Sequence, residues 1–158
     1  MEGEGRPLTA GPGPGASDIL RPMKLDGKKA GYVLLRLALG AVFLLYGVNK
    51  FHAGVGATID QMARQFERTF LPSIAVKAFA GALPSIEVVL GLLVLAGLFT
   101  RVALVLAGLE LIVLCAGLAV LGNAATVATN LLFLLVVYVL LAHEEDNALS
   151  LDAARKSS

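Results

Sequence analysis

The stretch AFAGALPSIEVVLGLLVLAGLF (Ala78–Phe99) contains 22 residues and a single formal charge, that of Glu87. An apolar run of about 20 residues is what an α-helix needs to cross about 30 Å of hydrocarbon. Because lipid offers no hydrogen bonds to the backbone, such a run is stable there only as a helix or as part of a closed barrel. Three further runs are similarly long and apolar: Ala30–Val48, Val102–Leu121 and Ala124–Ala142. Along the chain, the second, third and fourth of the four runs are separated only by short connectors. The sequence therefore predicts an all-α polytopic membrane protein whose four transmembrane helices form an antiparallel bundle.

The overall composition agrees with this class and excludes several others. Hydrophobic residues make up 57% of the chain and charged residues 16%, against roughly 45–50% and about 25% in soluble proteins. A net charge of +1 lacks the basic footprint of a nucleic-acid-binding protein. Cys115 is the only cysteine, and the two histidines are far apart in sequence. We therefore predict no metal site, no disulfide and no internal redox pair, so any redox chemistry needs a borrowed cofactor.

Outside the membrane domain, predicted over residues 29–142, the chain has two shorter segments. Residues 1–28 are rich in Gly and Pro and lack periodicity, which is typical of a flexible tail. Residues 143–158 form a second, C-terminal tail. The N-terminal segment, the turn at Arg101 and the C-terminal tail together carry eight Lys and Arg residues, whereas the segment from Lys50 to Lys77 carries four. The positive-inside rule then places both termini in the cytoplasm.

A short amphipathic helix is predicted between the first two transmembrane helices, at Thr58–Phe70 (TIDQMARQFERTF). Its apolar residues recur at helical spacing and form one face. Thr58 and Gln61 match a capping box at its start, and Pro72 ends the pattern. Such a helix either covers the bundle as a lid or rests in the headgroup region. The apolar face consists of Ile59, Met62, Phe66 and Phe70.

Ionisable residues inside the apolar runs are the strongest functional signal, because charges at membrane depth are costly and face a partner or a cavity. Arg36 and Lys50 lie on one stripe of the first helix, about 40° and about 21 Å apart. Counting residues from the ends of the runs places Arg36 and Glu110 together in the inner half of the bundle. We therefore predict that these two residues form a structural intramembrane pair.

The same counting predicts a second polar layer near the outer surface. Lys50 and Glu87 are its candidate catalytic residues, because a carboxylate beside a cation can exchange protons with a lipid-soluble ligand. In the alternative interpretation, each of these charges extends separately to the headgroups and has no ligand. The candidate ligand-binding residues of this layer are Tyr46, Asn49, His52 and Asn130.

Two stretches resemble a known family: LLRLALGAVFLLYGVNKF (Leu34–Phe51) and PSIEVVLGLLVLAGLFTR (Pro84–Arg101). They are similar to the DoxX family of small four-helix membrane proteins, and the similarity extends to Ala142. The resemblance implies a bacterial inner-membrane protein related to the membrane subunit of thiosulfate:quinone oxidoreductase, or to DoxX-like partners of redox enzymes. Recurring positions of the family correspond here to Arg36, Gly47, Lys50, Glu87, Gly97 and Arg101.

Three function classes follow from these observations. The first is a quinone-interacting membrane subunit of a quinone-linked oxidoreductase, with the quinone bound non-covalently. The second is a non-catalytic anchor or assembly partner for another enzyme. The third is a small transporter, which four helices without internal repeats favour least. In each class the protein contacts the lipid bilayer, and we expect a further protein subunit or a second copy of the chain as a partner.

Overall fold

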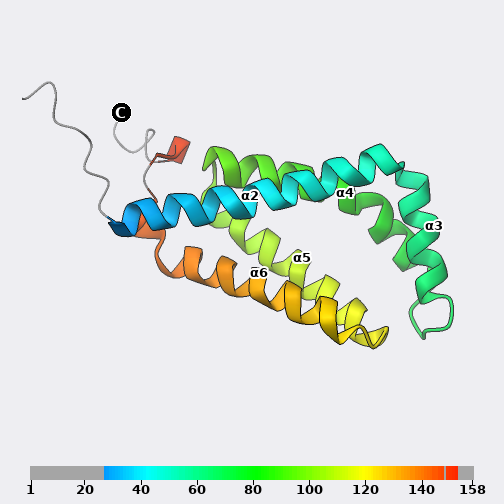
Figure 1. Ribbon diagram of the computed structural model, residues 1–158. Coiled ribbons are helices and arrows are strands. Elements are labelled where there is room, and N and C mark those ends of the chain that lie inside the picture. The colour runs from blue at the N-terminus through cyan, green and yellow to red at the C-terminus, as the bar shows by residue number, and fades with distance from the viewer. Residues whose placement is uncertain (1–26, 148, 153–158) are drawn as a thin grey trace, which may run out of the picture.

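The computed structural model describes residues 27–147 and 149–152, and within them the regular structure is entirely helical (Figure 1). Four helices are long and apolar enough to cross a membrane, and they confirm the predicted antiparallel bundle. Residues 1–26 of the predicted N-terminal tail lie outside the described range, and Gly27 already belongs to the first helix. The elements are α2 (Gly27–Ala53), α3 (Val55–Phe66), α4 (Ser73–Ala96), α5 (Thr100–Val120), α6 (Ala124–Ala142) and the 3₁₀ turn η1 (Glu144–Asp146).

The closest helix contact is between α2 and α4, and glycines make it possible. A Cβ placed on Gly91 would lie 2.5 Å from the backbone nitrogen of Leu44, and one on Gly47 would lie 2.8 Å from the carbonyl oxygen of Pro84. Between membrane helices there is little hydrophobic driving force, so close backbone packing at small residues holds them together. Gly47 therefore fixes the approach of α4 just where the charged residues of the outer half lie.

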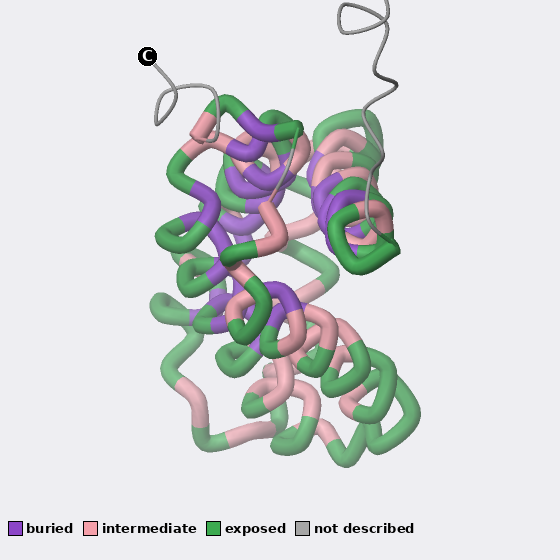
Figure 2. Tube along the Cα trace, turned by 90° about the vertical axis from the view of Figure 1, so that its left-hand side faces the viewer, coloured by how far each residue is buried: buried purple, intermediate pink, exposed green. Residues whose placement is uncertain are grey.

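The hydrophobic core is concentrated toward the end of the bundle that carries the α4–α5 turn. On α5 the buried residues run from Thr100 to Leu111 only, on α6 they are Val137 and Leu140, and α3 has none. Figure 2 shows the buried residues on the facing sides of the helices. The core cluster comprises Tyr32, Leu39, Phe43, Leu90, Val94, Ala103, Leu104, Ala107, Leu111, Val137 and Leu140.

The C-terminal segment folds back onto the α4–α5 turn. Gly97 ends α4 in the left-handed conformation, with φ of 63°, which favours glycine. Asp152 accepts hydrogen bonds from the backbone nitrogens of Phe99 (3.0 Å) and Thr100 (2.8 Å), and its own N–H donates to the carbonyl of Gly97 (3.0 Å). Asp152 thus supplies the N-terminal cap that Phe99, at the capping position, has no side-chain oxygen to provide.

Helix α3 crosses the end of the bundle opposite to the α4–α5 turn (Figure 1). The predicted start at a Thr58 capping box is wrong: α3 begins at Val55 after Gly54, which has φ of 93°, and the Thr58 hydroxyl donates back to the Gly54 carbonyl. The helix also ends early, at Phe66, so Phe70 lies in the following turn. Its apolar face packs on the bundle, with Ile59 against Gly81 of α4 and Phe66 against Gly117 of α5. Helix α3 therefore covers this end of the bundle.

Candidate functional site

Lys50 and Glu87 form an ion pair between the last turns of α2 and the middle of α4. The Lys50 Nζ donates to both carboxylate oxygens of Glu87 at 2.6 Å. The Glu87 side chain is 6% exposed and the Lys50 side chain 27%. Because the two charges meet, the alternative in which each extends separately to the headgroups is wrong. The centroid of the Tyr46 ring, one turn before Lys50, lies 5.6 Å from the ammonium and adds a cation–π contact.

Glu110 of α5 is the third ionisable group of this layer. Glu110 is 6% exposed, and neither of its carboxylate oxygens has a hydrogen-bond partner within the described part of the chain. It lies close enough to Glu87 and Lys50 to interact with both charges. The α4–α5 hairpin explains this position, because Glu87 lies 11 residues before Leu98 and Glu110 lies 12 residues after it. Two carboxyl groups and one ammonium therefore share one buried level of the bundle.

The predicted pair of Arg36 and Glu110 is wrong. Arg36 is 1% exposed, its Nη2 donates to the carbonyl oxygen of Leu149 at 2.9 Å, and its guanidinium packs against Gly97. The error has a geometric cause. The N-terminal end of α2 extends past the α4–α5 turn (Figure 1), so Arg36 lies level with Gly97 in that turn and not with Glu110 farther along α5. Arg36 thus connects α2 to the C-terminal segment, and Glu110 belongs to the layer of Lys50 and Glu87.

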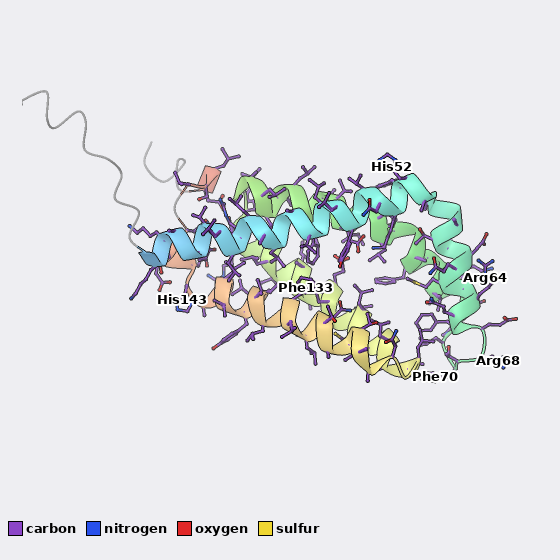
Figure 3. All side chains as sticks on the ribbon, viewed as in Figure 1. His52, Arg64, Arg68, Phe70, Phe133 and His143 are labelled. Carbon is purple, nitrogen blue, oxygen red and sulfur yellow. The ribbon has the colours of Figure 1, made fainter. Side chains whose placement is uncertain are left out.

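Three other predicted ligand-binding residues do not join the ion pair. Asn49 and His52 are exposed on α2, and Figure 3 shows His52 at the periphery of the molecule. Asn130 is half-buried on α6. The side chains of these three residues make no hydrogen bond within the described chain, whereas Tyr46 does contact Lys50. Within residues 27–147 and 149–152, His, Cys, Asp and Glu form no group that could hold a metal ion.

Comparison of the sequence with models of known protein families identifies the family of this chain. The model of the DoxX family matches residues 31–122, which is more than half of the chain. The chain belongs to the DoxX family. The matched range contains Arg36, Lys50, Glu87 and Glu110, so the whole polar layer and the Arg36 contact lie inside the DoxX region. No curated protein and no solved structure matches the chain. The resemblance noted at Leu34–Phe51 and Pro84–Arg101 is therefore confirmed at the level of the family.

Proposed function

We propose that this DoxX-family protein is the quinone-interacting membrane subunit of a redox system, in the bacterial inner membrane with both termini in the cytoplasm. The observation that carries the proposal is the buried layer of Lys50, Glu87 and Glu110, in which the Glu110 carboxyl has no partner in the described chain. Ionisable residues at membrane depth mark paths for protons, ions or ligands. Four apolar helices that only anchored another protein would have no need of this costly layer.

The residues present fit a quinone head. A quinone carbonyl needs a hydrogen-bond donor, and its reduction needs a source of protons. A carboxyl group buried in an apolar interior without its own cation is least costly as the neutral acid, so Glu110 is suited to donate a hydrogen bond to such a carbonyl. Lys50 is already held by Glu87. The layer therefore offers Glu110 as a hydrogen-bond donor that is unpaired in the described chain and Glu87 as a carboxylate paired with Lys50.

Each residue of the layer has a separate role in this proposal. When bound, a quinone supplies an acceptor for two electrons and two protons, and the electrons come from a redox-active protein subunit. Glu110 orients the head. Glu87 passes protons inward, and Lys50 holds the Glu87 carboxylate in place through both of its oxygens. Lys50 is the more exposed partner and lies in the last turn of α2, so it connects the buried carboxylates to the outer surface.

The test is the substitution Glu87→Gln. The matched control is Glu67→Gln, at an exposed position directly after α3. Tagged protein is purified from native membranes in mild detergent, and its quinone-reducing activity, bound quinone and protein partners are measured. We expect Glu87→Gln to abolish quinone reduction while the partners still copurify, because glutamine keeps the shape of the side chain but accepts no proton. Glu67→Gln should match the wild type.

The opposite result assigns a different role. If the Glu87→Gln protein retains full quinone-linked activity and the same partners, Glu87 has a structural role. If no quinone copurifies with the wild type and none is reduced, the proposed redox function is wrong. The protein then acts as an anchor or assembly partner.

Membrane orientation is testable independently of redox chemistry. In a Cys115→Ser background, single cysteines are placed at Asp60 on α3 and at Glu145 on η1, both exposed. We expect a membrane-impermeant maleimide to label Asp60→Cys from outside intact cells and Glu145→Cys only in inverted vesicles, because α3 and η1 lie at opposite ends of the bundle (Figure 1). Labelling of both positions from one side would contradict the four-span topology.

A further inference from the structure

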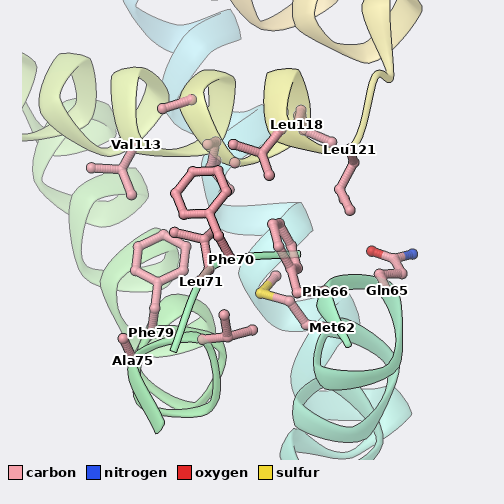
Figure 4. Close-up of a pocket in the computed structure, with 15 residues that line it drawn as sticks. Met62, Gln65, Phe66, Phe70, Leu71, Ala75, Phe79, Val113, Leu118 and Leu121 are labelled. Carbon is pink, nitrogen blue, oxygen red and sulfur yellow. The ribbon is translucent and has the colours of Figure 1, made fainter. Parts of the chain in front are cut away.

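An apolar cavity of about 480 Å³ lies between α3, the first turns of α4 and the outer half of α5. Figure 4 shows three aromatic rings, those of Phe66, Phe70 and Phe79, around it, together with Leu118 of α5 and Leu121 just after that helix. Gln65 is the only lining residue with a polar side chain. A space lined by apolar side chains favours apolar ligands over water, and the volume is within the usual range of about 300–1,000 Å³ for ligand sites.

The cavity lies on the same face of α5 as Glu110. Val113, Leu114 and Gly117 line it, and they follow Glu110 at steps of three, four and seven residues. Seven residues of α-helix correspond to a rotation offset of about 20° and a rise of about 10 Å. The Glu110 carboxyl therefore lies at the inner end of the stripe that forms the α5 wall of the cavity.

A matching stripe exists on α4. Val76 lines the cavity, and Glu87 follows it by 11 residues, an offset of about 20° around the helix axis. Ala80 and Leu83, both fully buried, fill this stripe between Val76 and Glu87. The α4 side is thus closed by packed side chains, whereas on α5 the lining residue Val113 lies about one helical turn from Glu110.

We infer that this cavity holds the isoprenoid tail of a prenylated quinone whose head reaches Glu110. The inference rests on the proposed function and assigns the orientation of the ligand: tail toward α3, head toward the Lys50–Glu87–Glu110 layer. A molecule with a flexible hydrocarbon tail and a carbonyl head combines the two chemistries found here, an apolar space and a buried carboxyl group with no partner in the described chain.

The position of the described chain ends argues against a segment of this protein as the occupant. The start of α2 lies at the end of the bundle that carries the α4–α5 turn (Figure 1), and Asp152 bonds to that turn. The cavity is lined by α3, at the opposite end. A 27-residue helix such as α2 spans about 40 Å, which exceeds the hydrocarbon thickness. The described chain ends are therefore separated from the cavity by the length of the bundle.

The test compares two quinones that share one head: a benzoquinone with a tail of four isoprenoid units and its analogue with a methyl group in place of the tail. Binding of each to the purified full chain is measured by equilibrium dialysis. Gly117→Leu is the cavity-filling variant, because a Cβ there already approaches the Phe66 ring at 3.2 Å. Leu109→Phe, at a position of α5 that is 54% exposed, is the control for added volume outside the cavity.

We expect Gly117→Leu to weaken binding of the tailed quinone by about tenfold or more, a loss that corresponds to about 1.4 kcal/mol. Binding of the tail-less quinone should change by less than about twofold, and Leu109→Phe should change neither. If wild-type protein binds both quinones and Gly117→Leu affects them equally or not at all, the tail site is wrong while the proposed function stands. If the wild type binds neither quinone, the proposed function itself is wrong.

A second measurement uses the unmodified chain and so does not depend on how the variant folds. A tailed quinone with a photoreactive diazirine near the end of its tail is irradiated with the wild-type protein, and the adducts are mapped by mass spectrometry. We expect adducts on Met62, Phe79 or Leu118. Adducts confined to the lipid-facing side of α6, such as Leu132, or a phospholipid that the tailed quinone cannot displace, would overturn the inference.

Discussion

Replacing Gly91 by alanine is expected to lower the free energy of unfolding by about 3 kcal/mol, at the upper end of the usual cost of overpacking. The added Cβ would lie 2.5 Å from the backbone nitrogen of Leu44, 2.8 Å from its Cα and 2.9 Å from the carbonyl oxygen of Gly40. All three atoms belong to the backbone of α2. No side-chain rotation can relieve the clash, so α2 and α4 must move apart, and the Lys50–Glu87 pair lies in that same interface.

The measurement is the unfolding of purified protein in mixed micelles by sodium dodecyl sulfate, followed by far-ultraviolet circular dichroism. Gly31→Ala on α2 is the matched control, because nothing lies within 4 Å of a Cβ at that position. Alanine in an open helical position should leave stability unchanged or raise it by up to about 1 kcal/mol. Equal stability of the Gly91→Ala and Gly31→Ala proteins would contradict the close α2–α4 contact.

The transmembrane helices could be predicted from the sequence because each depends on a local property, the length of an apolar run. Ala124–Ala142 coincides with α6, whereas α4 begins at Ser73, five residues before the predicted run. The extra turn contains Lys77, and hydropathy cannot detect helix that extends beyond the hydrocarbon. The Lys50–Glu87 contact was predictable for a related reason, since counting from the outer ends of two adjacent antiparallel runs places both residues in the outer half of the bundle.

The Arg36 contact could not be obtained in this way, because it depends on how far each helix extends beyond its neighbours. Counting from the ends of apolar runs assumes that all helices start at one level, and α2 does not. The position of Glu110 could have been found from the α4–α5 hairpin, whose turn at Leu98 fixes which residues of the two helices face each other. Counting residues from a short connector therefore predicts the level of a residue along the bundle better than counting from the end of an apolar run.

The role of Asp152 had only an indirect signal. The residues before α5 offer no capping side chain at Phe99, so the free N–H groups of that helix end indicate a cap from elsewhere. The partner is separated from Thr100 by 52 positions, and no local pattern identifies it. Such contacts depend on where the chain returns after α6, which the sequence does not encode in a short motif.

Lys50→Met is expected to destabilise the protein by about 3–5 kcal/mol, the usual cost of removing one partner of a buried ion pair. The loss leaves Glu87 without the ammonium that now bonds both of its oxygens, next to a second buried carboxyl, that of Glu110. Glu87→Gln should cost less, about 1 kcal/mol, because Lys50 is partly exposed and its long side chain can extend to the outer headgroups. The asymmetry follows from the difference in burial between the two side chains.

The double variant Lys50→Met/Glu87→Gln should therefore be more stable than Lys50→Met alone by about 2 kcal/mol, because it removes the buried charge together with its partner. Lys77→Met, at an exposed position of α4 with no ion pair to any residue of the described chain, is the control and should stay within about 0.5 kcal/mol of the wild type. Unfolding in the same mixed micelles gives all four free energies and, from them, the coupling energy of the pair. Additive losses, or a greater loss for Glu87→Gln than for Lys50→Met, would show that Glu87 does not depend on Lys50. The charged layer would then have to be held by another group.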